Sequence, residues 1–102
     1  MMQNIDAALL PGEELVERGL AELARGELTD CALLLLMAAP RLRRIGIQVP
    51  ERQLPEPAEH LLYAQLEARL GTAAHSYYNS LVRRITSFAS ALERETGRTT
   101  QT

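Results

Sequence analysis

The feature that most constrains the fold is an uninterrupted run of nine apolar residues, Cys31–Ala39. Wound into a helix, this run is apolar on every side, so the helix must be surrounded by other parts of the chain. It is far too short to cross a membrane, which takes roughly 20 residues. Thr29 or Asp30 can cap the start of the helix, and Pro40 is expected to end or kink it. We therefore expect a central, buried helix.

Further helices are predicted on both sides of this run, because apolar residues recur there at helical spacing. One covers residues 13–25, and another runs from Pro57 to about Leu70. The connection before the second helix, residues 46–57, contains three prolines and is expected to be extended. Ile47 and Val49 are expected to pin this connection to the core.

The last predicted helix begins at a Thr72 cap and ends at Gly97. Its apolar residues alternate at spacings of four and three, a heptad pattern that indicates a packing surface; we call it the heptad seam, and it consists of Ala74, Tyr78, Leu81, Ile85, Phe88 and Leu92. No run with a period of two residues is present, so no strand is expected. The sequence predicts an all-α protein: a compact bundle of four main helices, in which two helical hairpins are joined by a proline-rich connection.

The 102 residues suit a single domain. We expect an N-terminal arm at residues 1–12, the helical domain at residues 13–96 and a flexible tail at residues 97–102. The N-terminus has no basic segment ahead of an apolar stretch, which predicts that the protein is not secreted and stays in the cytoplasm. We expect no membrane association.

Metal and cofactor sites are not predicted. A structural zinc site takes about four Cys or His ligands, and the chain has one Cys and two His. The isolated glycines do not form a phosphate-binding loop. The formal net charge of −2 also argues against a general attraction to nucleic acid, so any such binding would be local.

The segment 69–77 carries an Arg, a His six residues later and a Tyr two residues after the His. It resembles the motif of the HEPN ribonucleases, all-helical proteins often found in toxin and antitoxin pairs. The resemblance implies that Arg69 would stabilise a phosphate and that His75 would transfer protons on RNA, with Tyr77 as the accompanying tyrosine. In the structural alternative, Arg69 is a solvated helix-end charge, His75 belongs to a first helical turn and Tyr77 is partly buried.

Two groups of arginines are candidates for contacts with phosphates or an acidic partner: Arg41, Arg43 and Arg44, with Arg52 nearby, and Arg83 with Arg84. They make a nucleic-acid-binding regulator a further alternative. A helix-turn-helix reader is excluded, because its recognition helix would be the apolar run, which cannot contact base edges. The same arginines can equally pair with the acidic residues of the chain.

We favour a small, non-catalytic protein-interaction module, either self-associating or acting as a subunit or regulator of a larger complex. The apolar run and the heptad seam offer much apolar area for a chain of this length, and a surplus would close a homo-oligomer or bind a protein partner. The predicted interface consists of Tyr78, Leu81, Ile85, Phe88 and Leu92. The alternative is that the apolar run and the heptad seam are both buried in one internal core.

Overall fold

The computed structural model describes the backbone of residues 10–101 and the side chains of residues 10–95. The elements are α2 (Glu13–Ala24), α3 (Asp30–Arg44), α4 (Ala58–Leu70), the short 3-10 helix η1 (Gly71–Ala73) and α5 (Ala74–Gln101). Within this range no strand occurs, so the prediction of an all-α chain is confirmed. Most of the predicted arm, residues 1–12, lies outside the described residues.

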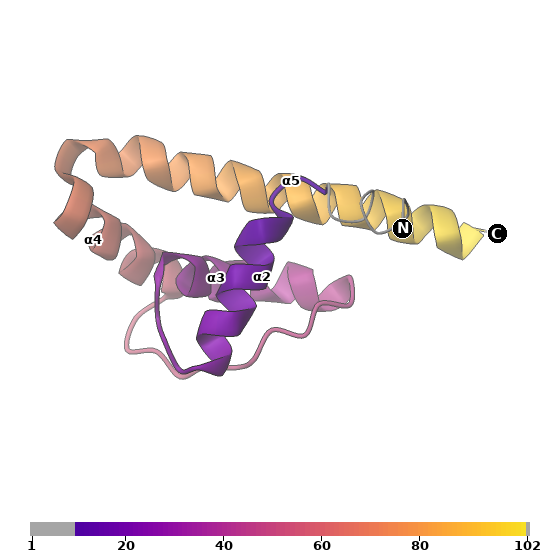
Figure 1. The fold of residues 1–102 in the computed structure, drawn as a ribbon, viewed down its shortest axis with the longest axis horizontal. Helices are drawn as coiled ribbons and strands as arrows, with labels where there is room; N and C mark the ends of the chain where they lie inside the picture. Colours follow the sequence, from indigo (N-terminus) through magenta and orange to yellow (C-terminus); the bar gives the residue numbers. More distant parts are fainter. Residues whose placement is uncertain (1–9, 102) are drawn as a thin grey trace.

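α3 is the central helix, as the apolar run predicts (Figure 1). The hydroxyl oxygen of Thr29 accepts a hydrogen bond from the Ala32 N–H at 3.2 Å and caps the first turn. The helix then contacts α2, α4 and α5. Leu34 and Leu35 are fully buried in its middle. The neighbouring helices therefore satisfy the requirement that this apolar segment be surrounded.

α3 does not end at Pro40 but continues to Arg44. A proline inside a helix removes one main-chain hydrogen bond. The turn that follows is held by contacts from two of its arginines: Arg41 reaches α5 through Glu93, and Arg43 reaches the connection after α3. These contacts explain why the last turn of α3 persists beyond the proline.

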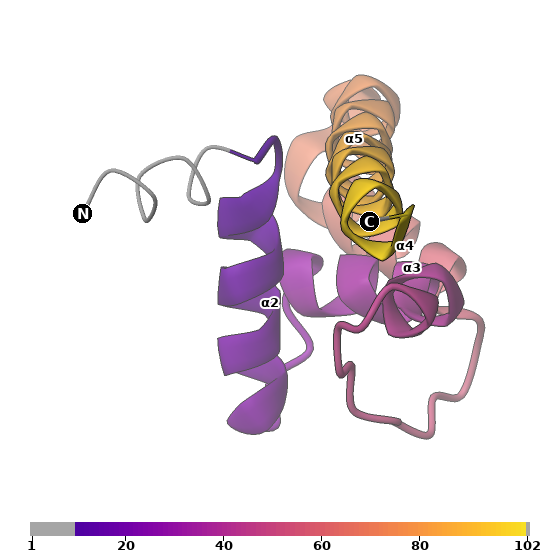
Figure 2. The same cartoon turned by 90° about the vertical axis from the view of Figure 1, so that its right-hand side faces the viewer.

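α2 crosses the other helices steeply (Figures 1 and 2). The crossing is made possible by Gly19, which is buried against α3. A Cβ atom at this position would lie 2.7 Å from the side chain of Leu35 and 2.9 Å from the carbonyl oxygen of Cys31. Because α2 lies across its neighbours, the predicted bundle of four main helices is not confirmed beyond its all-helical character.

α4 turns back into α5 through η1 (Figure 1). Gly71 adopts a φ of 59°, which lets the chain reverse within a few residues. Thr72 lies inside η1 and does not cap the last helix as predicted, because α5 follows the 3-10 turn directly. The predicted helix end at Gly97 is also wrong, since α5 continues to Gln101. A glycine costs a helix only about 1 kcal/mol relative to alanine, which does not stop a long helix.

The heptad seam of α5 faces the interior of the chain. Its buried members are Ala74, Leu81, Ile85 and Phe88, and its partly buried members, Tyr78 and Leu92, pack against the same core. The connection between α3 and α4 packs against this core through buried Val49 and partly buried Ile47, as the sequence predicts. One internal core thus takes up the apolar run and the seam together.

Candidate functional site

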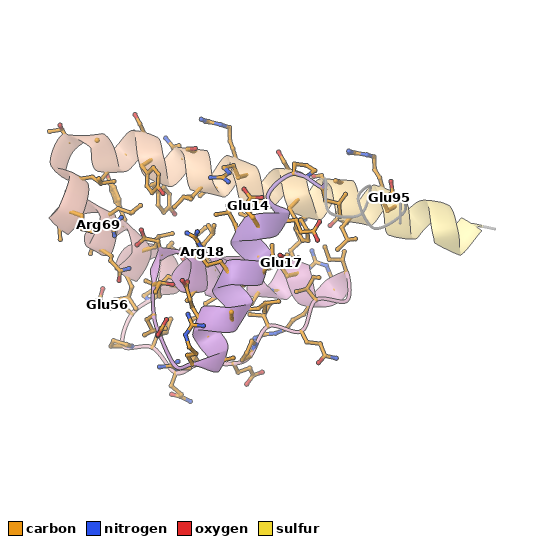
Figure 3. The ribbon with its side chains drawn as sticks, viewed as in Figure 1. Glu14, Glu17, Arg18, Glu56, Arg69 and Glu95 are labelled. Atoms are coloured by element: carbon orange, nitrogen blue, oxygen red, sulfur yellow. The ribbon has the colours of Figure 1, made fainter. Side chains whose placement is uncertain are left out.

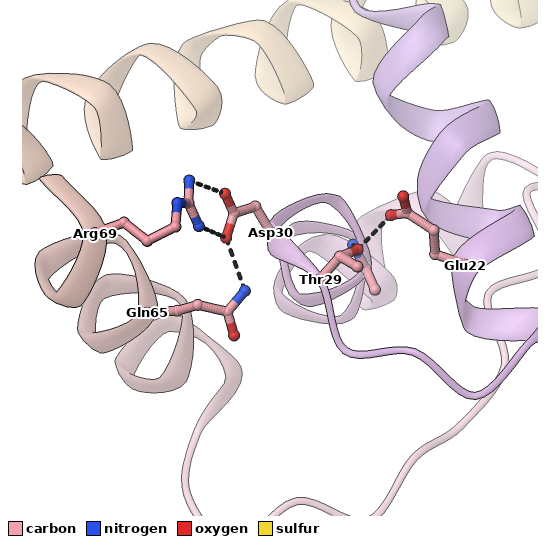
Figure 4. Close-up of polar contacts among 6 residues, drawn as sticks. Glu22, Thr29, Asp30, Gln65 and Arg69 are labelled. Atoms are coloured by element: carbon pink, nitrogen blue, oxygen red, sulfur yellow. Dashed lines mark hydrogen bonds and ion pairs between the residues drawn. The ribbon is translucent and has the colours of Figure 1, made fainter.

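A polar network joins the start of α3 to α4, and Arg69 is part of it (Figure 4). The two guanidinium nitrogens of Arg69 donate to the two oxygens of Asp30, at 2.8 and 3.2 Å. Gln65, one turn earlier on α4, donates to the same carboxylate at 2.8 Å. A bidentate pair of this kind fixes geometry as well as adding energy. The network therefore adds a polar link between α3 and α4.

These donors stabilise the ionised form of the Asp30 carboxyl group. Burial of its carboxyl group would by itself raise the pKa, but the hydrogen bonds from Arg69 and Gln65 outweigh burial and lower the pKa below its ordinary value. The adjacent Thr29 hydroxyl donates to the carboxylate of Glu22 on α2. Contacts at the first residues of α3 thus reach α4 on one side and α2 on the other (Figure 4).

His75 and Tyr77 lie on the first turns of α5, just after η1. The Nε2 atom of His75 lies 3.2 Å from the side-chain nitrogen of Asn79, one turn later in the same helix. The imidazole ring also meets the ring of Tyr63 edge to face, with ring centres 6.4 Å apart. Tyr77 is exposed, with 42% of its surface accessible, and its position differs from the partly buried one of the structural alternative.

The structure places Arg69 within electrostatic range of Tyr77, but Arg69 and His75 have different hydrogen-bonding partners. The guanidinium of Arg69 is engaged by Asp30, whereas His75 contacts residues of α4 and α5. The ion pair that uses Arg69 could not have been found in the sequence, because 39 positions separate its two partners. The arrangement accounts for Arg69 as a residue that orders the fold.

Two of the arginines at the end of α3 make contacts within the chain. Arg41 donates to both carboxylate oxygens of Glu93 at 2.9 Å and to the Ser90 hydroxyl at 3.1 Å. Arg43 donates to the carbonyl oxygen of Val49 at 2.8 and 3.0 Å. Arg44 is exposed. These contacts support the structural interpretation of Arg41 and Arg43.

Arg83 and Arg84 line a hollow of about 350 Å³ between the start of α2 and the middle of α5. Arg84 donates to Glu14 of α2 in an exposed ion pair, and Glu14 lies at the end of α2 that meets α5 (Figure 3). The other lining residues are Pro11, Gly12, Ser80 and Ser87. The two serines share a helical face with the arginines, at a spacing of three and four residues that is visible in the sequence.

Among the side chains that the structure describes, the exposed large hydrophobic ones are Leu70 and Tyr77. Leu70 ends α4 and Tyr77 lies on the second turn of α5, so both belong to the α4–α5 corner, which we define as residues 69–77. The predicted interface of Tyr78, Leu81, Ile85, Phe88 and Leu92 is instead turned toward the core. The corner was not recognised as an interface in the sequence, because exposure depends on what the other helices cover.

Among residues 10–95, no group of three or more His, Cys, Asp or Glu side chains is arranged to hold a metal ion. Cys31 is a free thiol buried in the core, and burial raises its pKa. Within the same described part of the chain, no helix combines the length and the apolar character needed to cross a membrane.

Comparisons of the chain with protein-family models, with curated proteins and with solved structures found no match.

Proposed function

We propose that this chain is a small, non-catalytic interaction module that binds another protein through the α4–α5 corner. The observation that carries the proposal is the exposure of Leu70 and Tyr77, 37% and 42%, in a structure that otherwise covers its described large apolar side chains. The two residues come from consecutive elements that meet at one corner. Contiguous exposed apolar surface marks binding sites, and the proposal takes these two side chains to form one such surface.

The composition of the corner supports binding to a protein. Tyrosine and arginine are enriched among the residues that dominate binding energies at protein interfaces. Arg69 stands beside Leu70 with half of its side chain exposed, although it also pairs with Asp30. A partner would therefore meet an aromatic ring, an aliphatic side chain and a guanidinium group within a short stretch of chain.

The corner is also held in place before any partner arrives. The Arg69 guanidinium is fixed by Asp30, and Tyr63 packs against His75 and Tyr78 with ring centres 6.4 and 5.4 Å away. A preorganised surface loses less conformational entropy on binding than a mobile one. The partner is a second copy of the chain or another subunit of a complex.

The proposal is tested by placing a photo-crosslinking amino acid at position 77 and, as the matched control, at Thr86, which is exposed on the same helix. Light scattering on the purified chain over a wide range of concentrations first determines whether it self-associates. We expect crosslinks to form from position 77 and not from position 86, to a second copy if scattering shows an oligomer. Equal crosslinking from both positions would contradict the proposal.

Substitution supplies the quantitative part of the test. Tyr77→Ser should weaken the complex that crosslinking identifies about thirtyfold or more, since a residue that dominates binding contributes at least about 2 kcal/mol. Thr86→Ser should leave the affinity unchanged. If the two variants behave alike, the corner is not the binding surface.

A further inference from the structure

We propose that the hollow between the start of α2 and the middle of α5 binds a single phosphate group. It lies farther along α5 than the α4–α5 corner and faces α2, so it does not depend on the function proposed above. The hollow is open to solvent and has a volume of about 350 Å³, which leaves room for a phosphate with part of its hydration water. Its basic side chains, Arg83 and Arg84, are both exposed and thus reachable from solvent.

The donors of the hollow come from one face of α5. Ser80, Arg83, Arg84 and Ser87 follow one another at spacings of three, one and three residues, so their side chains project from the same side of the helix. The guanidinium forks of arginine match phosphate oxygens in pairs. Serine hydroxyls add donors that suit the remaining oxygens. Such a set fits an anion with several acceptor oxygens better than a single carboxylate.

The opposite wall of the hollow is backbone. Gly12 approaches α5 so closely that a Cβ atom there would lie 2.6 Å from the carbonyl oxygen of Arg84, and its φ is 79°. Gly12 also precedes the first turn of α2, a helix of 12 residues whose N-terminal end carries a partial positive charge. The N–H groups of Leu15 and Val16 are already bonded to the Gly12 carbonyl. The carboxylates of Glu13 and Glu14 in this first turn offset the partial positive charge, so the donors for the anion are those of α5.

Glu14 is the group that competes with the ligand. Its carboxylate accepts from Arg84, in a pair whose side chains are 66% and 44% exposed. Exposed pairs of this kind are weak, so a phosphate dianion can displace the carboxylate from the guanidinium. Removing this carboxylate should therefore strengthen binding.

The test is a titration of the full chain with sodium phosphate, followed by backbone amide chemical shifts, with ionic strength held constant by sodium chloride. We expect saturable shifts at Gly12, Ser80 and Ser87. Arg83→Gln should weaken binding about tenfold, the effect of losing one charge-assisted hydrogen bond. Glu14→Gln should strengthen binding severalfold. The matched control is Arg94→Gln, an exposed arginine on the same helix that does not line the hollow.

The proposal is overturned if the shifts do not saturate, or if Arg94→Gln weakens binding as much as Arg83→Gln, since either result indicates general ionic attraction. It is also overturned if Glu14→Gln leaves the affinity unchanged. A second titration, with phosphoserine, tests whether the hollow binds free phosphate or a phosphate group attached to another molecule. Equal affinity would assign the site to phosphate groups on other molecules as well, and a large loss would assign it to the free ion.

Discussion

Replacing Gly19 with alanine should destabilise the protein, although the same change in most helices is stabilising. Alanine is favoured over glycine in a helix by about 1 kcal/mol. Here the added methyl group would lie 2.7 Å from two carbon atoms of Leu35 and 2.9 Å from the Cys31 carbonyl oxygen. Carbon atoms in contact are normally about 3.5–4.0 Å apart, so α2 and α3 would have to separate by close to an ångström.

The net effect can be estimated from these two opposing contributions. Leu35 is fully buried, so it has little room to give way, and overpacking of a core costs about 1–3 kcal/mol. Subtracting the gain in helix propensity leaves a loss of up to about 2 kcal/mol. For a domain of this size that loss lowers Tm by up to about 15 °C. Thermal unfolding followed by circular dichroism measures the shift directly.

A second variant tests the cause. Leu35→Ala alone should cost about 2–5 kcal/mol by leaving a cavity. In that background Gly19→Ala should no longer destabilise and should recover up to about 1 kcal/mol, since the methyl group gains space. A rise in Tm for Gly19→Ala in the parent protein, or the same loss in both backgrounds, would refute the close approach of α2 to α3.

Three further predictions rest on burial and charge. Leu62→Ala, at a fully buried position, should lower the free energy of unfolding by about 2–5 kcal/mol, whereas Leu70→Ala at the exposed corner should change it by less than about 1 kcal/mol in the same urea titration. The lowered pKa of Asp30 contributes stability above its unfolded value of about 3.9, and this contribution is lost as pH falls from there through the lower folded pKa. Asp30→Asn should therefore reduce the loss of stability on acidification, and an unchanged pH profile of urea unfolding would contradict the role of its pair with Arg69. Cys31, buried with a raised pKa, should react with a thiol reagent only as fast as the chain opens; rapid labelling under native conditions would show that the α2–α3 contact is loose.

The resemblance to the HEPN ribonucleases leads to a further prediction about substitutions at Arg69 and His75. Arg69→Gln should lower Tm, because the variant loses the bidentate pair with partly buried Asp30, and His75→Ala should lower Tm less, because the exposed ring loses an edge contact with Tyr63. If the parent chain cleaves RNA and His75→Ala abolishes cleavage, the interaction module proposed above is not the whole function.

The local features of the fold could be read from the sequence because they depend on neighbouring residues. Helical periodicity has a range of a few positions, so α2, α4 and the apolar run of α3 are found near their expected places. The cap at Thr29 is local in the same sense, since its partner Ala32 is three positions away. Where the local signal fails, at Gly97, a long helix continues through a residue that disfavours it.

The tertiary structure decided which surfaces remain available. The heptad seam looks the same in the sequence whether it meets the chain's own core or a second copy, and only the packing of α5 against the other helices turns it inward. Arg41, Arg69 and Arg84 likewise acquire partners 39 to 70 positions away. Periodicity reports that a helix has an apolar face, but the partner of that face is set by long-range packing. For this reason the sequence predicted the class of fold, while the corner and the hollow became visible only in three dimensions.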